Sequence, residues 1–261
     1  MKLATFQATE LDYPLAGEVV DDRVVPFTGP TTTVRDVLAG EPADRGPDSW
    51  PLSDVTLLAP IPRPGTIYAI GLNYAKHVEE MGGQRPAQPI VFVKVVNSAA
   101  PPGGPIRCPG VVRRLDYEGE LTIVIGAAGQ IGGYCVADDV TARDLQGREP
   151  QWTRAKGADT FCPFGPWVTT ADEVPDPGRL RLRTWVNDDL RQDSNTSDLV
   201  FGCQELVDFI AQTCMLSPGD LILTGTPSGV GMGLDPPRFL QPGDVVRIEI
   251  EQLGVIEHAV A

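Results

Sequence analysis

Histidine is scarce in this chain, which has only His77 and His258 among its 261 residues. A zinc site built mainly from histidine is therefore excluded. The five cysteines include no Cys-x-x-Cys pair, and their odd number suggests neither a zinc ribbon nor a disulfide framework. Any bound metal would be held mainly by oxygen, which favours Mg²⁺ or Mn²⁺.

Positive charge is also sparse, because 21 Lys and Arg stand against 35 Asp and Glu, for a formal net charge of −14. Nucleic-acid binding needs clustered cations, and the only basic doublet is Arg113-Arg114. A nucleic-acid partner is therefore not expected. An acidic surface repels anions, so a site for an anionic substrate would need its own local cations.

Long apolar runs are missing too. No stretch approaches the roughly 20 apolar residues that a membrane span requires, and no apolar signal core follows Met1. Residues 225–229 do not form the Gly-x-Ser-x-Gly pattern of a nucleophile elbow, and no Walker A sequence occurs. We expect a cytoplasmic protein with no membrane partner.

Glycine and proline are abundant, with 28 and 25 residues spread over the whole length. Gly and Pro distributed in this way favour many short strands over long helices. Strands are predicted at residues 66–71, 90–96, 120–125, 133–137, 180–186, 220–224 and 244–251. Helices are predicted at residues 34–38, 74–81 (with Asn73 as the N-cap) and 203–215. No βαβ rhythm appears.

The chain divides at about residue 60. Residues 1–60 are expected to form a small β-rich N-terminal domain with its connector, and residues 61–261 the main domain. The predicted helix at 74–81 is too short to be stable alone in water. It is a candidate lid unless tertiary contacts hold it.

Two glutamates precede an apolar run in the segment 115–126. Residues two apart in a strand point to the same face, so Glu118 and Glu120 project together. The near-continuous apolar run after them indicates a buried strand rather than a solvated one. Two like charges placed there require a cation between them.

A second acidic pair, Asp138 and Asp139, ends another apolar run. Alternation sends these side chains to opposite faces, so only one of them can join a site with the glutamates. Two glutamates and one aspartate would form a three-carboxylate site for a hard cation, with positions open for water and substrate. Alternation leaves open which aspartate takes part.

Four cations lie near these predicted strand ends: Lys94, Arg143, Arg154 and Lys156. Each of them, taken alone, is expected to be a surface charge. Lys156 is flanked by small residues, and a partly buried lysine near carboxylates is a common means of stabilising an oxyanion.

Six motifs, in this order, resemble those of the fumarylacetoacetate hydrolase superfamily. They are GLNYA-x-H-x-x-EM at residues 71–81, DYEGEL at 116–121, DVTARDLQ at 139–146, WT-x-AK at 152–156, GPW at 165–167 and LTGTP-x-GVG at 223–231. The resemblance covers roughly residues 55–261. It implies a mostly β fold with minor α, in which mixed sheets form a rolled sandwich, assembled as a homodimer.

The resemblance also implies Mg²⁺ or Mn²⁺ bound by Glu118, Glu120 and Asp139, which selects Asp139 over Asp138. Lys156 is implied as the cation that polarises the substrate oxygen.

His77 and Glu80 are implied as an acid/base pair, and their i, i+3 spacing places them on one helical face. Three further residues match positions that hold the substrate carboxylate or line its pocket: Arg143, Gln146 and Thr226.

These residues imply an enzyme that acts on a small 2-oxo acid through a metal-bound enolate. The favoured reaction is C–C hydrolysis of an acylpyruvate or a related 1,3-dicarbonyl, with water activated by His77 and Glu80. Oxaloacetate decarboxylation and isomerisation of 2-hydroxyhepta-2,4-diene-1,7-dioate in aromatic catabolism pass through the same enolate and are alternatives. A non-catalytic member that keeps the fold is the alternative of another class.

Overall fold

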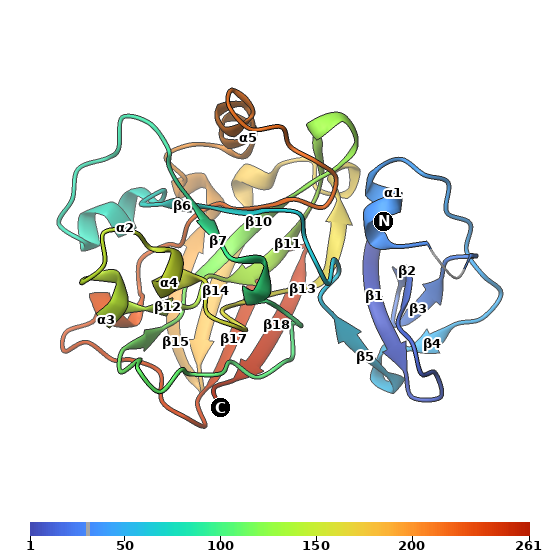
Figure 1. The fold of residues 1–261 in the computed structure, drawn as a ribbon, viewed down its shortest axis with the longest axis horizontal. Coiled ribbons are helices and arrows are strands. Elements are labelled where there is room, and N and C mark those ends of the chain that lie inside the picture. Colours follow the sequence, from blue (N-terminus) through green and yellow to red (C-terminus); the bar gives the residue numbers. More distant parts are fainter. Residues whose placement is uncertain (30–31) are drawn as a thin grey trace.

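Strands dominate the protein, whose computed structural model describes residues 1–29 and 32–261 (Figure 1). The largest sheet contains, in spatial order, β4 (Trp50–Pro51), β3 (Arg23–Pro26), β2 (Leu15–Val20), β1 (Lys2–Ala8), β13 (Cys162–Thr170), β11 (Ile131–Asp138), β10 (Gly119–Ile125), β16 (Leu221–Leu223), β6 (Ile67–Gly71) and β7 (Ile90–Lys94). Off this path, β5 (Val55–Leu58) pairs with β1, and β8 (Ala99–Ala100) pairs with β13. The sheet mixes parallel and antiparallel pairs.

A second sheet packs against the first. Its order is β15 (Asp189–Asn195), β14 (Arg181–Val186), β17 (Val245–Ile250) and β18 (Gly254–Ala259), and β9 (Leu115–Asp116) pairs separately with β12 (Thr141–Ala142). The helices are short: α1 (Val34–Leu38), α2 (Ala75–Glu80), α3 (Arg143–Gln146), α4 (Thr153–Lys156) and α5 (Cys203–Ala211). The predicted fold class, mostly β with minor α, is confirmed.

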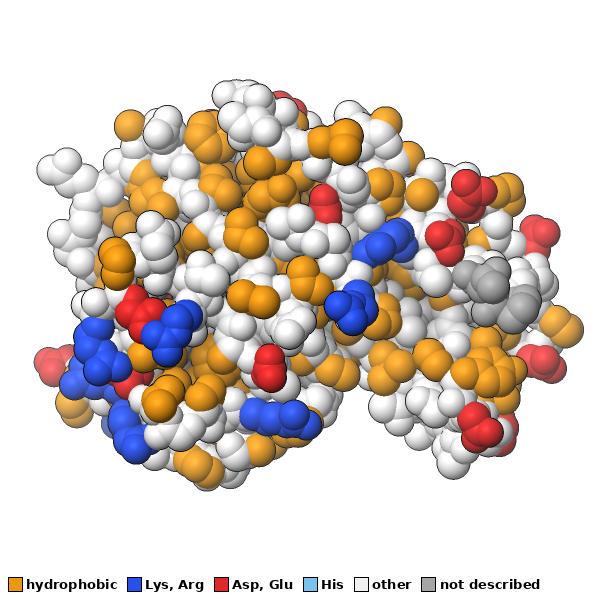
Figure 2. Space-filling model, viewed as in Figure 1, with side chains coloured by type: hydrophobic (Ala, Val, Ile, Leu, Met, Phe, Trp, Pro, Cys, Tyr) orange, Lys and Arg blue, Asp and Glu red, His pale blue; other side chains and the backbone are white. Residues whose placement is uncertain are grey.

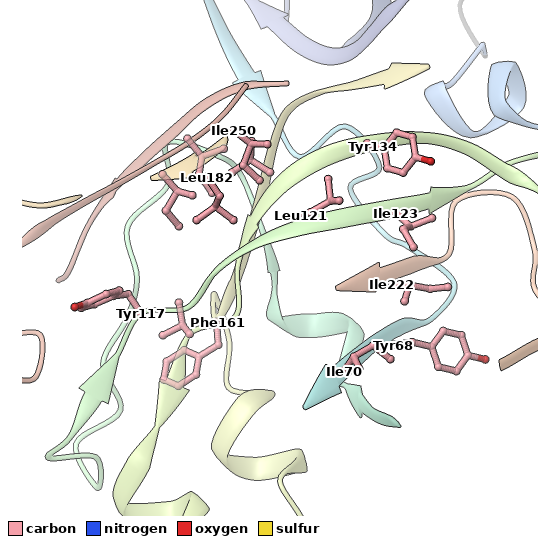
Figure 3. Packing of buried hydrophobic residues seen from close by; sticks show 14 of the residues in the cluster. Tyr68, Ile70, Tyr117, Leu121, Ile123, Tyr134, Phe161, Leu182, Ile222 and Ile250 are labelled. Atoms are coloured by element: carbon pink, nitrogen blue, oxygen red, sulfur yellow. The ribbon is translucent and has the colours of Figure 1, made fainter. Parts of the chain in front are cut away.

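The main core lies between the two sheets, where β10 and β11 face β14 and β17 (Figure 3). Every residue of β10 is buried, as the apolar run predicted. Leu121 and Ile123 point into this core, whereas Val124 joins a second core on the opposite face of the sheet. Because β10 is buried on both faces, polar groups at its start are also held away from water.

The N-terminal strands lie to one side of the molecule (Figure 1). They are not a separate sheet, because β1 pairs with β13 through Lys2–Thr169 and Leu3–Val168. The hydroxyl of Thr5 also donates to the carbonyl of Pro60. The expected boundary near residue 60 follows β5, but the ladder of the large sheet continues across it.

Some local expectations need correction. Helix α5 ends at Ala211 and not at residue 215, since Thr213 and Cys214 are weak helix formers and a Ser-Pro-Gly turn follows. Strand β13 was not predicted, because Pro163 and Pro166 argue against a central strand. A register shift against β11 lies at Pro166, and Pro163 lies beyond that ladder, where it pairs with Ala100 of β8. No helix among the described residues is long and apolar enough to cross a membrane.

Candidate active site

The register between β10 and β11 brings three carboxylates together. Glu120 pairs with Ala137, so their side chains share one face of the sheet. Glu118 and Asp139 each lie two residues from this pair and project to the same face. One oxygen from each of Glu118, Glu120 and Asp139 lies within 4.8 Å of the others, and all three residues are buried.

Asp138 lies on the opposite face, where its register partner is Gly119. Its Oδ1 accepts from the backbone N–H of Glu118 at 2.8 Å, and its Oδ2 is 2.9 Å from Nε2 of His258. The structure therefore places Asp139 beside the glutamates and Asp138 in the interface between the two sheets.

Three of the four cations expected at the surface are instead buried: Lys94, Arg143 and Lys156. Nζ of Lys156 is 2.7 Å from both Glu118 and Asp139, and Nζ of Lys94 is 2.5 Å from Asp139. The expectation was wrong because carboxylates more than a dozen residues away in sequence supply partners inside the protein. Arg154 alone is exposed and pairs with Glu149.

Arg143 completes this ion-pair network. Its Nε is 2.7 Å from Asp116 and its Nη2 is 2.7 Å from Glu118. Burial acts to raise the pKa of Glu118, but the charges of Lys156 and Arg143 outweigh it and lower that pKa to about 2. Glu118 is therefore ionised at any physiological pH.

Glu120 has the opposite environment. None of the salt bridges among the described residues includes it, and one of its oxygens accepts from the backbone N–H of Gly225 at 2.6 Å. Burial, followed by repulsion from Asp139 and Glu118, raises its pKa well above the ordinary value. A buried carboxylate that lacks a cationic partner beside two others fits a divalent metal with oxygen ligands.

His77 and Glu80 lie on one face of α2 and form a hydrogen bond of 2.9 Å between Nδ1 and Oε2. An ionised Glu80 only accepts, so this contact assigns the single proton of a neutral imidazole to Nδ1 and leaves Nε2 as the proton acceptor. The other oxygen of Glu80 accepts from the N–H of Gly229 at 2.9 Å. Glu80 thus orients the imidazole and is itself oriented by the backbone.

Tertiary contacts hold α2 in place. Tyr74 and Val78 are buried, and the N–H of Lys76 donates to Asp198 at 3.1 Å. Asn73 is not the helix N-cap as predicted, because Tyr74 occupies that position. The amide of Asn73 instead donates to the carbonyls of Phe201 and Thr224. These two bonds connect the residues before α2 to two segments that are distant in the sequence.

A cavity of about 410 Å³ opens beside the carboxylates. The predicted residues His77, Glu118, Arg143, Gln146, Lys156 and Thr226 all line it. The amide oxygen of Gln146 accepts from Arg143 at 3.0 Å, and the hydroxyl of Thr226 donates to the carbonyl of Gly119 at 3.0 Å. The structure therefore brings the predicted site residues to one place.

Two residues that support this site, Gln192 and Asp116, were not predicted from the sequence. Gln192, fully buried on β15, donates to Thr226 at 2.8 Å and accepts from the N–H of Gly119 at 3.1 Å. It lies in a polar segment with no signal of burial. Asp116 contacts Arg143 at 2.7 Å, and its position in the motif at residues 116–121 was the one signal that the sequence offered.

Charge is unevenly distributed over the surface. Figure 2 shows Asp and Glu side chains on the N-terminal part of the visible face, whereas Lys and Arg side chains gather near α3 with Asp and Glu side chains among them.

Comparison with known proteins agrees with this geometry. Residues 66–261 match the family described as fumarylacetoacetate (FAA) hydrolase C-terminal. The chain belongs to the fumarylacetoacetate hydrolase family. The matched region contains both glutamates, Asp139, Lys156 and the His77–Glu80 pair.

Members of the fumarylacetoacetate hydrolase family with named activities are similar over nearly the whole chain. The mitochondrial oxaloacetate tautomerase Fahd2a of Rattus norvegicus is 40% identical over 98% of this chain and 90% of its own. The 5-carboxymethyl-2-hydroxymuconate delta-isomerase of Mycobacterium smegmatis is 36% identical (TM-score 0.84; coverage 100% and 99%). The 2-hydroxyhepta-2,4-diene-1,7-dioate isomerase of Mycobacterium marinum is 35% identical (TM-score 0.82; coverage 100% and 98%).

Proposed function

We propose that this chain is a divalent-metal-dependent enzyme that forms the enolate of a small 2-oxo acid. The observation that carries the proposal is the cluster of Glu118, Glu120 and Asp139, whose oxygens approach within 4.8 Å beside Lys156. Mg²⁺ or Mn²⁺, held by these three carboxylates, would supply a Lewis acid for the substrate oxygens. A non-catalytic role is less well supported, since the acid/base pair and all three carboxylates are present.

The side chains around the cavity have distinct tasks in this proposal. Lys156 uses two of its three N–H donors on Glu118 and Asp139, and its ammonium would stabilise negative charge that develops on the substrate oxygen. Nε2 of His77 would take or return a proton, while Glu80 fixes the ring orientation. Arg143, Gln146 and Thr226 would position the carboxylate end of the substrate.

Proton transfer, either tautomerisation or isomerisation, is the first candidate reaction, because the named relatives are a tautomerase and two isomerases. Hydrolysis of a C–C bond in an acylpyruvate is the second candidate. It is favoured by the His77–Glu80 hydrogen bond, which is the arrangement a general base for water requires. Decarboxylation of oxaloacetate would use the same enolate without attack by water.

A substrate panel distinguishes these reactions. Acylpyruvates, oxaloacetate and hydroxydienedioates are incubated with the protein and Mg²⁺ or Mn²⁺, and the products are followed by NMR. Keto–enol conversion without bond cleavage would support the first candidate, and release of pyruvate with a carboxylic acid the second. No reaction with any 2-oxo acid in the presence of either metal would contradict the proposal.

We also propose that the chain assembles as a homodimer. Strand β7 is an edge strand of the large sheet, Val91 and Val93 share one of its faces, and Val95 directly follows it. Their exposed fractions of 36%, 46% and 39% make an apolar stripe on an unpaired edge, which soluble proteins usually cover. A second copy of the chain is the proposed cover.

A further inference from the structure

The cavity beside the carboxylate cluster has walls of two kinds. One part carries the polar and charged side chains already described. The other part is apolar and comes from β6 and its following turn, β7, the residue that follows α2, and two loops. Six side chains form this apolar wall: Ile70, Leu72, Met81, Phe92, Trp152 and Met232.

Two aromatic rings shape the apolar wall. Phe92 and Trp152 pack edge to face, with ring centroids 5.2 Å apart. Gly71 allows this packing, because a Cβ at that position would lie 2.9 Å from the indole ring of Trp152. Nζ of Lys156 is 5.4 Å from the centroid of Phe92, so the apolar wall begins directly beside the charged head of the site.

The cavity offers no spare cation. In the described part of the chain, only two Lys or Arg side chains line it, Arg143 and Lys156. The proposed function places both at the substrate head, Lys156 at the oxo group and Arg143 at the first carboxylate, and both already contact carboxylates of the protein. A second carboxylate on the substrate would therefore lose its hydration against apolar side chains without gaining a partner.

We propose that the site selects 2-oxo acids that have a single carboxylate and an apolar distal group, and that it discriminates against dicarboxylates. The apolar wall is the subsite for the distal group, and Trp152 is its main specificity-determining residue. The inference rests on the proposed function for the position of the substrate head. The cavity volume is in the range that binds whole small molecules, about 300–1,000 Å³, so it has room for such a distal group.

A matched pair of ligands tests the proposal. The two compounds 2-oxohexanoate and 2-oxoadipate have the same number of carbon atoms and differ only in a terminal methyl or carboxylate. Isothermal titration calorimetry of the Mn²⁺-loaded protein should give a Kd for 2-oxohexanoate that is about tenfold lower or better. Exchange of the C3 protons with D₂O, followed by NMR, reports enolate formation with the same two compounds.

Variants test the assignment of the wall. Trp152→Ala should weaken binding of 2-oxohexanoate by about tenfold and that of 2-oxoadipate by less than about threefold. Met81→Lys adds a cation at the rim, where Met81 is 39% exposed, and should lower the preference for 2-oxohexanoate by about tenfold. Met215→Lys is the control, because Met215 is 90% exposed and outside the cavity wall; the preference should not change.

Failure of this inference is distinguishable from failure of the proposed function. Binding of 2-oxoadipate at least as tight as that of 2-oxohexanoate, with C3 exchange of both, would overturn the apolar subsite and leave enolate chemistry in place. If neither compound shows C3 exchange, the proposed function is overturned. The ratio of the two Kd values would still decide whether the wall prefers an apolar distal group.

Discussion

Nε2 of His258 lies 2.9 Å from Oδ2 of Asp138, and both side chains are fully buried between the two sheets. The other oxygen of Asp138 accepts from the backbone N–H of Glu118. The last strand of the chain, β18, is thereby connected through one carboxylate to the backbone of a proposed metal ligand.

Replacement of this histidine should destabilise the fold. His258→Ala leaves a fully buried carboxylate without its side-chain partner, and we expect a loss of roughly 2–3 kcal/mol in the free energy of unfolding. Urea unfolding of the variant and the wild type measures this difference in the free energy of unfolding. Glu257→Ala is the control on the same strand, since Glu257 is exposed, and equal losses in the two variants would contradict a role for the Asp138–His258 contact.

Two glutamates that are two residues apart should respond in opposite directions without metal. Glu120→Gln removes a repelled, buried charge and should raise the melting temperature of the metal-free protein, whereas Glu118→Gln removes a partner of Lys156 and Arg143 and should lower it. Both variants should lose the increase in melting temperature that excess Mn²⁺ gives to the wild type. A full Mn²⁺ response in either variant would exclude that residue as a ligand.

The stability of the metal-free protein should depend on pH through Glu120. Its pKa in the folded state is raised well above the ordinary value of 4.5, so the folded state binds the proton of Glu120 more tightly than the unfolded state does. This contribution is present below about pH 4.5 and decreases as the pH rises through the raised pKa. Glu118 acts oppositely, and its contribution decreases as the pH falls from 4.5 towards 2.

Unfolding in urea between pH 5 and 8 with a chelator measures the effect of Glu120. The free energy of unfolding should have a less negative slope with pH in Glu120→Gln than in the wild type. Identical slopes in the two proteins would show that Glu120 does not titrate in this range.

His77→Ala should separate the candidate reactions. Loss of the general base should reduce acylpyruvate hydrolysis by about two to four orders of magnitude, and oxaloacetate decarboxylation less, because no water is activated in that reaction. The ratio of the two kcat/KM values is the measurement. Equal losses would mean that the His77–Glu80 pair is not mainly a water activator.

Disruption of the β7 stripe should produce monomers. Val93→Glu places a charge in the centre of the proposed interface, where burial without a partner is unfavourable. Sedimentation velocity should show a shift from dimer to monomer. Leu190→Glu is the matched control, because Leu190 is 49% exposed on β15, an edge strand of the other sheet; a monomeric wild type would contradict the dimer.

Much of the fold around the carboxylates could be predicted from local pattern. The apolar run after Glu120 predicted a buried strand, and all of β10 is buried. Strand β13 could not be predicted in this way, because its prolines contradict the usual rule and its position depends on pairing with β1 and β11. Local periodicity contains no information on such long-range pairing.

The residues of the candidate site could be predicted from the sequence only in part. Alternation placed Glu118 and Glu120 on one face but left Asp138 and Asp139 as alternatives, which the resemblance to a family separated. The burial of Lys94 had no local signal, since its partner Asp139 is 45 residues away. Buried ion pairs depend on both partners, so a sequence pattern around one of them is insufficient.

The pairing of β1 with β13 has a consequence for shortened forms of this protein. In the large sheet only β13 lies between β1 and β11, and Asp139 directly follows β11. Deletion of residues 1–60 would leave the edge of β13 at Val168 and Thr169 without its partner strand β1. The shortened protein should expose an unpaired strand edge and self-associate, so residues 61–261 should not behave as an independent catalytic fragment.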